Sequence, residues 1–138
     1  MADVTTNAAE FSAALRQEMQ RLTEREIVLL HKKVTLQVLD GVVRMSPVDT
    51  GRFRNAWVTS VSSPDNSQPE QIGGGAGAPP SGEQMAQALG AMTALPAFGV
   101  SFVQNNLPYA QRLEDGWSSQ APAGMVRATL ERVRGQFN

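Results

Sequence analysis

The sequence predicts a small α+β domain with a long N-terminal helix, a small antiparallel β-sheet, a Gly/Pro-rich insert, a short helix and a C-terminal helix. Three observations support this fold class. Helix-forming residues fill 8–45 with only Gly41 as an interruption, two runs of alternating β-branched and aromatic residues lie at 56–62 and 98–105, and a stretch rich in glycine and proline separates them. Helical and strand-forming runs that are segregated in this way are typical of α+β domains.

A chain of 138 residues with 41% hydrophobic residues is long enough for one domain with one core. We expect a single domain over 1–138. Its predicted parts are a long helix (1–45), a turn and strand (46–62), a flexible insert with a short helix (63–97), and a strand with the C-terminal helices (98–138).

Charge and composition argue against several classes of function. Twelve Lys and Arg stand against 13 Asp and Glu, so the chain has no basic field that would attract nucleic acid or an anionic membrane. The absence of cysteine excludes disulfides, a thiolate nucleophile and a cysteine-based zinc site. No run is apolar enough to predict a membrane span or a cleaved leader.

The first half of the predicted helix has one apolar face. Phe11, Leu15, Met19 and Leu22 recur at spacings of three and four residues, which align on a helix of period 3.6. A continuous helix over 8–45 would be roughly 55 Å long, which exceeds the body of such a small domain. We therefore predict that this apolar face packs against another subunit.

A turn and a strand follow the helix. Pro47 ends the helix because its ring disfavours the α conformation of the preceding residue. Asp49, Thr50 and Gly51 are turn residues, since Gly51 tolerates positive φ and the two side chains can accept hydrogen bonds from nearby amides. The strand over 56–62 would carry Trp57, Thr59 and Val61 on one face.

The insert contains the run GGGAGAPPSG, which buries too little apolar area to offset the entropy of ordering. Ser81 and Gln84 match a capping box and predict a short helix that ends before Pro96. The next strand is expected to place Phe98, Val100 and Phe102 on one face. The C-terminal region predicts a helical turn from Pro108 to Gly116 and a final helix that opens near Pro122. Its buried side would carry Met125, Val126, Leu130 and Val133.

No set of residues predicts an active site, so we expect no catalytic residue, no cofactor and no metal. His31 is the only histidine and cannot hold a metal alone. Glu114 and Asp115 are neighbours on a helix and point about 100° apart, so we expect surface or capping roles. Arg52 and Arg54 are expected to pair with acidic groups such as Glu114 or Asp115. The glycine-rich run lacks the Gly-Lys-Ser or Gly-Lys-Thr ending of a phosphate loop.

Two motifs, taken in order, resemble the tail-completion proteins of long-tailed bacteriophages, the group that includes lambda-type minor tail protein Z and head-tail connector relatives. The first motif, P-V-D-T-G-R-x-R, consists of Pro47, Val48, Asp49, Thr50, Gly51, Arg52 and Arg54. The second consists of Asn106, Leu107, Pro108, Tyr109, Ala110, Leu113, Glu114 and Gly116. A closing stretch similar to that of the lambda-type branch contains Gln120, Pro122, Gly124, Met125 and Val126. The resemblance covers about 38–133, without the insert.

The resemblance implies a structural virion protein at the head-tail junction, assembled in the cytoplasm of a host bacterium. Such a protein forms a homo-oligomeric ring, on the order of six or twelve copies, because a head-to-tail interface repeated by rotation closes on itself. Its partners would be neighbouring connector, tail terminator or tail tube proteins, and DNA would pass through the lumen without specific binding. The subunit interface is expected at Phe11, Leu15, Met19, Leu22 and the Tyr109–Trp117 segment, with the insert reaching toward a neighbour.

Two other functions stay open. A small hydrolase would use Glu114 or Asp115, and a bound substrate would identify it. A regulatory module that binds nucleic acid would use Arg52 and Arg54 beside Phe53 and Trp57, and would show binding that depends on salt concentration.

Overall fold

A computed structural model describes residues 4–20 and 22–137 of the chain. Its helices and strands confirm the predicted α+β class and the antiparallel pair of strands. In chain order they are α1 (Val4–Met19), α2 (Glu24–Arg44), α3 (Arg52–Asn55), β1 (Trp57–Val61), α4 (Gly82–Met92), β2 (Ser101–Asn105), α5 (Ala110–Glu114), α6 (Val126–Arg134) and a 3-10 turn, η1 (Gly135–Phe137).

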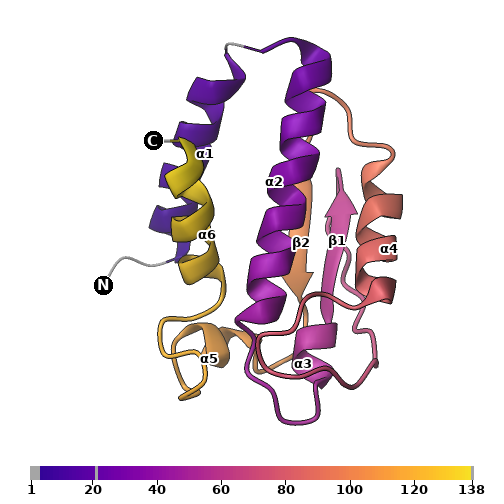
Figure 1. Cartoon of the computed structure of the whole chain (residues 1–138), viewed down its shortest axis with the longest axis vertical. Coiled ribbons are helices and arrows are strands. Elements are labelled where there is room, and N and C mark those ends of the chain that lie inside the picture. Colours follow the sequence, from indigo (N-terminus) through magenta and orange to yellow (C-terminus); the bar gives the residue numbers. More distant parts are fainter. Residues whose placement is uncertain (1–3, 21, 138) are drawn as a thin grey trace.

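The stretch predicted to be helical over 8–45 is divided between two helices, so it does not project from the domain as one continuous helix. Thr23 adopts an extended conformation and caps α2: its hydroxyl accepts from the Glu26 amide at 3.3 Å and donates to the Glu26 carboxylate at 2.9 Å. The chain reverses before this cap, and α1 lies beside α6 instead of extending α2 (Figure 1).

Helix α2 and the two-stranded sheet form the centre of the molecule. The strands pair antiparallel, from Trp57 opposite Asn105 to Val61 opposite Ser101. Figure 1 shows α2 lying across one face of this sheet, with α1 and α6 on one side and α4 on the other. Trp57 and Thr59, which were predicted to share a face with Val61, are buried, and Val61 packs against the core. The core cluster contains Leu39, Val42, Val43, Phe53, Ala56, Trp57, Ala88, Met92, Leu107, Ala121 and Met125.

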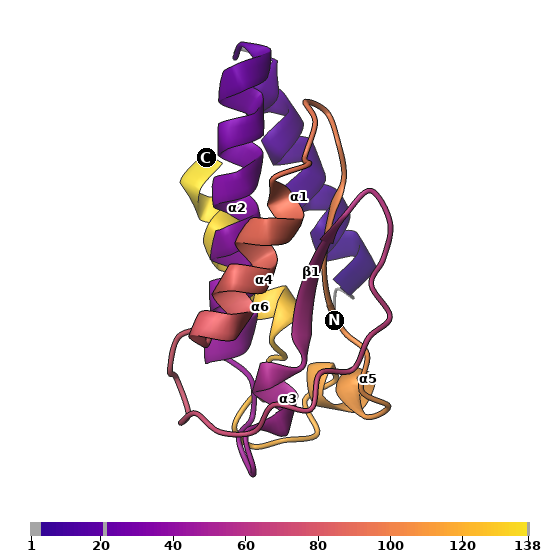
Figure 2. The same ribbon diagram turned by 90° about the vertical axis from the view of Figure 1, so that its right-hand side faces the viewer.

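Helix α4 begins with the predicted capping box, in which the Ser81 hydroxyl and the Gln84 side chain each accept from the other residue's main-chain amide. The helix is nevertheless part of the core, because Ala88 and Met92 are buried beside β1 (Figure 2). The Gln87 side chain bonds both the amide and the carbonyl of Thr59, at 3.0 and 2.6 Å, and so covers the outer edge of β1. The 63–97 insert is therefore not a separate excursion from the fold.

The second strand starts later than predicted. It begins at Ser101, while Phe98 lies before it at φ 60° with 65% of its surface exposed. Phe98 therefore does not share a strand face with Phe102. The final helix begins at Val126, and its buried side carries Leu130 and Val133 as predicted, together with Thr129.

Candidate assembly interface

The first motif forms a tight turn between α2 and β1. Pro47 is buried at the end of α2, and Gly51 adopts φ 88° as the N-cap of α3. A Cβ atom at Gly51 would lie 2.2 Å from the carbonyl oxygen of Gly73, so only glycine fits. Asp49 and Thr50 are exposed, and the Thr50 hydroxyl accepts from the Arg52 amide at 3.2 Å.

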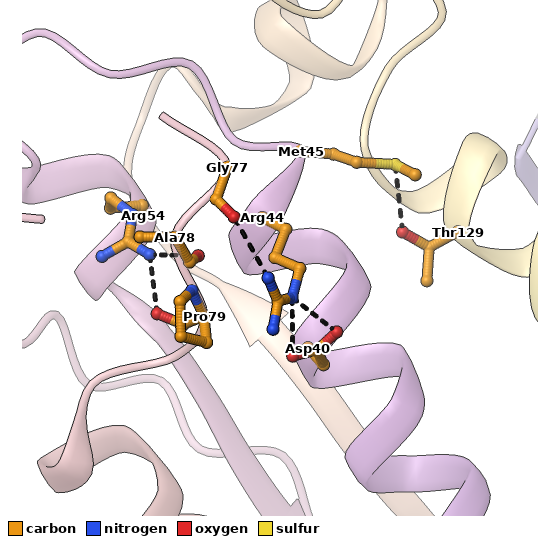
Figure 3. A network of polar contacts seen from close by, with 8 residues as sticks. All are labelled: Asp40, Arg44, Met45, Arg54, Gly77, Ala78, Pro79 and Thr129. Atoms are coloured by element: carbon orange, nitrogen blue, oxygen red, sulfur yellow. Dashed lines mark hydrogen bonds and ion pairs between the residues drawn. The ribbon is translucent and has the colours of Figure 1, made fainter. Parts of the chain in front are cut away.

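Arg54 ties this turn to the glycine-rich segment. Its side chain is 2% exposed, and Nη2 donates to the carbonyls of Ala78 and Pro79 at 2.6 and 2.8 Å (Figure 3). Burial lowers the pKa of the Arg54 guanidinium. The prediction that Arg54 pairs with Glu114 or Asp115 is therefore wrong. The carbonyls of this segment face a cation, which is the opposite of a phosphate loop, where amides face an anion.

Further bonds hold the same segment in place. The Asn55 amide donates to the carbonyls of Gly51 and Gly73, each at 2.7 Å, and the Gly73 amide donates to Thr50 at 3.1 Å. From α2, Arg44 donates to the Gly77 carbonyl at 3.2 Å while it bonds Asp40 at 2.9 Å (Figure 3). The segment predicted to be flexible is thus attached to the first motif and to α2 at several points.

The second motif forms a cap for α6. Glu114 is 6% exposed, and its carboxylate accepts from the amides of Met125, Val126 and Arg127 at 2.9, 2.8 and 3.1 Å. These amides belong to the first turn of α6, whose donors have no partner within the helix. Gly124 has φ 78°, and a Cβ there would lie 2.5 Å from Glu114 Oε2, so the closing stretch needs glycine at this point.

The two motifs meet at one end of the molecule, where α3 and α5 lie together (Figure 1). The ring of Phe53 contacts those of Tyr109 and Trp57, with centroids 5.8 and 5.9 Å apart. The Gln120 side chain bonds the amide and carbonyl of Val48 at 2.9 and 3.1 Å. A depression of about 310 Å³ lies between the motifs. It is lined by Pro47, Val48, Asp49, Thr50, Gly51, Arg52, Phe53, Tyr109, Leu113, Ser118 and Gln120.

Exposed aromatic surface lies next to this depression. Trp117 is 71% exposed and Tyr109 is 39% exposed. The Arg112 guanidinium lies 5.1 Å from the centroid of the Trp117 ring and shields one of its faces. Tryptophan, tyrosine and arginine are residue types that are enriched at protein interfaces.

The apolar face of α1 lies across a groove from β2. Phe11, Leu15 and Met19 are half-buried and line this groove of about 670 Å³. Leu22 falls in the turn after α1, outside the groove lining. Asn7 bonds Glu131 and Glu10 forms an ion pair with Arg134, so α1 is attached to α6 by its other side.

His31 lies on α2 as a half-buried polar residue. Its Nε2 is 2.9 Å from the Ser101 hydroxyl, which is also 2.9 Å from the Thr35 hydroxyl. Asp115 is exposed and accepts from the Gln111 amide group at 3.1 Å. Within the described residues, no cluster of three or more His, Cys, Asp or Glu side chains could hold a metal ion.

The stability of the fold is expected to depend on pH through His31. Burial lowers the pKa of His31, so the unfolded chain takes up its proton first as the pH falls. The stability that the fold gains from keeping His31 neutral is fully present above the unfolded pKa of about 6.5. It is lost as the pH falls through the lower folded pKa. Chemical denaturation of wild type and His31→Gln between pH 7.5 and 5 checks this: the wild type should lose more stability than the variant, and equal losses would contradict it.

Sequence patterns predicted the turn after the first helical region and a surface or capping role for Glu114, but not the partners of Arg54 or Glu114. Within 4–20 and 22–137, no helix is both long and apolar enough to cross a membrane. No family model matches the chain, and neither the curated proteins nor the solved structures contain a match.

Proposed function

We propose that this chain is a structural virion protein of a long-tailed bacteriophage, a ring-forming part that joins the tail tube to the head and lets DNA pass. The proposal starts from the ordered pair of motifs that resembles the tail-completion group. The observation that carries it is their convergence: the motifs meet around Phe53 and support one exposed surface that includes Tyr109, Arg112 and Trp117.

The placement of the motif residues favours a scaffold over a catalyst. Glu114 accepts three main-chain hydrogen bonds, and Arg54 is enclosed by carbonyls, so neither presents a reactive group to a substrate. The backbone beneath this surface is held by buried polar hydrogen bonds from Arg54, Asn55 and Glu114. Rigid aromatic anchors of this kind give an interface affinity at low entropic cost.

The near-neutral charge suits a part through which DNA slides. Phosphate contacts require clustered Lys and Arg, whereas the net charge here is -1 and the buried Arg54 is not accessible. In the proposed ring, the surface around Trp117 contacts the next subunit or the adjoining connector or tube protein. Assembly and attachment then depend on buried contact area rather than on chemistry.

Replacing Trp117 with alanine is expected to weaken assembly at least about tenfold, because a buried interface tryptophan typically contributes 2 kcal/mol or more. The fold itself should keep its stability, since Trp117 is 71% exposed. Analytical ultracentrifugation of the purified chain, alone and with the connector and tube proteins of the same virus, measures the change.

Leu89→Ala is the matched control, because Leu89 is 51% exposed on α4, away from the motifs. It should assemble as the wild type does. Equal assembly of Trp117→Ala and Leu89→Ala would remove Trp117 from the interface, and failure of the wild type to enter any assembly would contradict the proposed function.

A further inference from the structure

The outer edge of β2 has main-chain groups without hydrogen-bond partners among residues 4–20 and 22–137. The Ser62 amide donates to the Val100 carbonyl at 2.8 Å, so these two residues face each other across the strands. In an antiparallel pair, hydrogen-bonded and non-bonded positions alternate. Phe102 and Gln104 therefore point their main-chain groups toward β1, while Ser101, Val103 and Asn105 point theirs away from it.

Strand β1 supports this assignment independently. Thr59 lies opposite Val103 and gives its amide and carbonyl to the side chain of Gln87 on α4, away from β2. The two edges of the sheet therefore differ in their hydrogen bonding. The β1 edge is covered by Gln87, whereas no hydrogen bond within the described residues reaches the main-chain amides or carbonyls of Ser101, Val103 or Asn105.

This open edge forms one wall of the groove between α1 and β2. Phe11, Leu15 and Met19 form the opposite wall, and Val34 and Val38 of α2 lie on its floor. A strand added to β2 would lie about 4.8 Å from it, and its inward side chains would meet these apolar residues. Its outward side chains would lie beside Phe102 and the 55% exposed Val100.

We propose that this groove binds an extended segment of a different protein chain, which adds to β2 as a third strand. The open row of amides and carbonyls requires an extended backbone, and the apolar walls require a segment with apolar or β-branched side chains and no charge at its centre. The β2 strand of a second copy could not insert here. In that copy α2 covers β2, and this α2 would collide with the α1 that closes the far side of the groove. The groove would take such a segment whether or not the chain belongs to a virion.

Hydrogen exchange of the full chain tests the proposal with a capped, soluble peptide of about seven alternating threonine and valine residues. Saturating peptide should slow exchange of the Val103 and Asn105 amides at least about tenfold. The amides of Phe102 and Gln104, which bond β1, should be protected with or without peptide. The same peptide with an N-methyl group on every residue should protect nothing, because neither of its edges can then donate to the ladder.

A pair of variants separates the loss of the amide from the loss of the side chain. Val103→Pro removes an amide that has no bond in the described part of the chain, and Val103→Ala keeps that amide. The peptide should protect Asn105 in Val103→Ala but not in Val103→Pro, with both variants folded by circular dichroism.

Three results would overturn the proposal. They are no protection of Val103 in the wild type, equal protection by the N-methylated peptide, or protection of Val103 that rises with the concentration of the chain alone. The last result would assign the groove to a second copy. If Val103→Pro does not fold, the N-methylated peptide decides the question with the wild type.

Discussion

Replacing Glu114 with alanine is expected to lower the free energy of unfolding by about 3–5 kcal/mol. The change leaves the amides of Met125, Val126 and Arg127 without their acceptor in a buried site and removes a negative charge from the N-terminus of α6. Urea denaturation followed by circular dichroism measures the loss. Glu114→Gln should lie between alanine and the wild type, because one acceptor oxygen remains.

Asp115→Ala is the matched control for Glu114, since it removes the neighbouring carboxylate from an exposed position. Its effect should stay within about 0.5 kcal/mol. Similar losses in Glu114→Ala and Asp115→Ala would show that charge near α5, and not the cap of α6, is what matters. A loss below about 1 kcal/mol in Glu114→Ala would contradict the capping role.

Replacing Gly51 with alanine is expected to cost about 3 kcal/mol or more, because the new Cβ meets main-chain atoms of Gly73 that cannot move without breaking the bonds of Thr50 and Asn55. Positive φ adds about 1 kcal/mol of strain. The melting temperature of the purified variant checks the prediction.

Gly77→Ala isolates the steric part of this effect. Gly77 also has positive φ, 76°, but a Cβ there meets nothing within 4 Å. It should show only the conformational cost of about 1 kcal/mol. Equal destabilisation by the two substitutions would mean that the contact between Gly51 and Gly73 contributes little.

The buried residues of the two motifs have structural roles. Gly51, Arg54 and Glu114 each contact the backbone of a segment that is distant in the sequence. No other residue type would fit these contacts with the same geometry. Asp49, Thr50 and Arg52 are exposed or half-buried around the depression between the motifs. The buried members therefore hold the backbone of this end of the molecule in place.

Local patterns predicted much of the fold. Alternation identified β1, and the Ser81–Gln84 capping box identified the start of α4. The break before α2 also has a local signal, since Thr23 and Glu26 have the spacing of a capping box. Strong helix propensity on both sides concealed this signal, because no Gly or Pro occurs between residues 8 and 40.

The polar partners could not be read from the sequence, because they join distant parts of the chain. Arg54 bonds carbonyls of residues 24 and 25 positions away, and Asn55 bonds a residue 18 positions away. A carbonyl acceptor carries no side-chain signature, so sequence favours carboxylates as partners for arginine even where the fold provides main-chain oxygens. The apolar face of α1 could not be assigned a partner either. Its amphipathic pattern indicated that this face is covered, but not which part of the protein lies across from it.

Native mass spectrometry of the purified full chain, alone and mixed with the connector and tail tube proteins of the same virus, tests the proposed ring most directly. One closed multimer of fixed copy number, in which every subunit is equivalent, is the predicted result. A monomer that stays a monomer at every concentration and joins none of these proteins would contradict the proposed role.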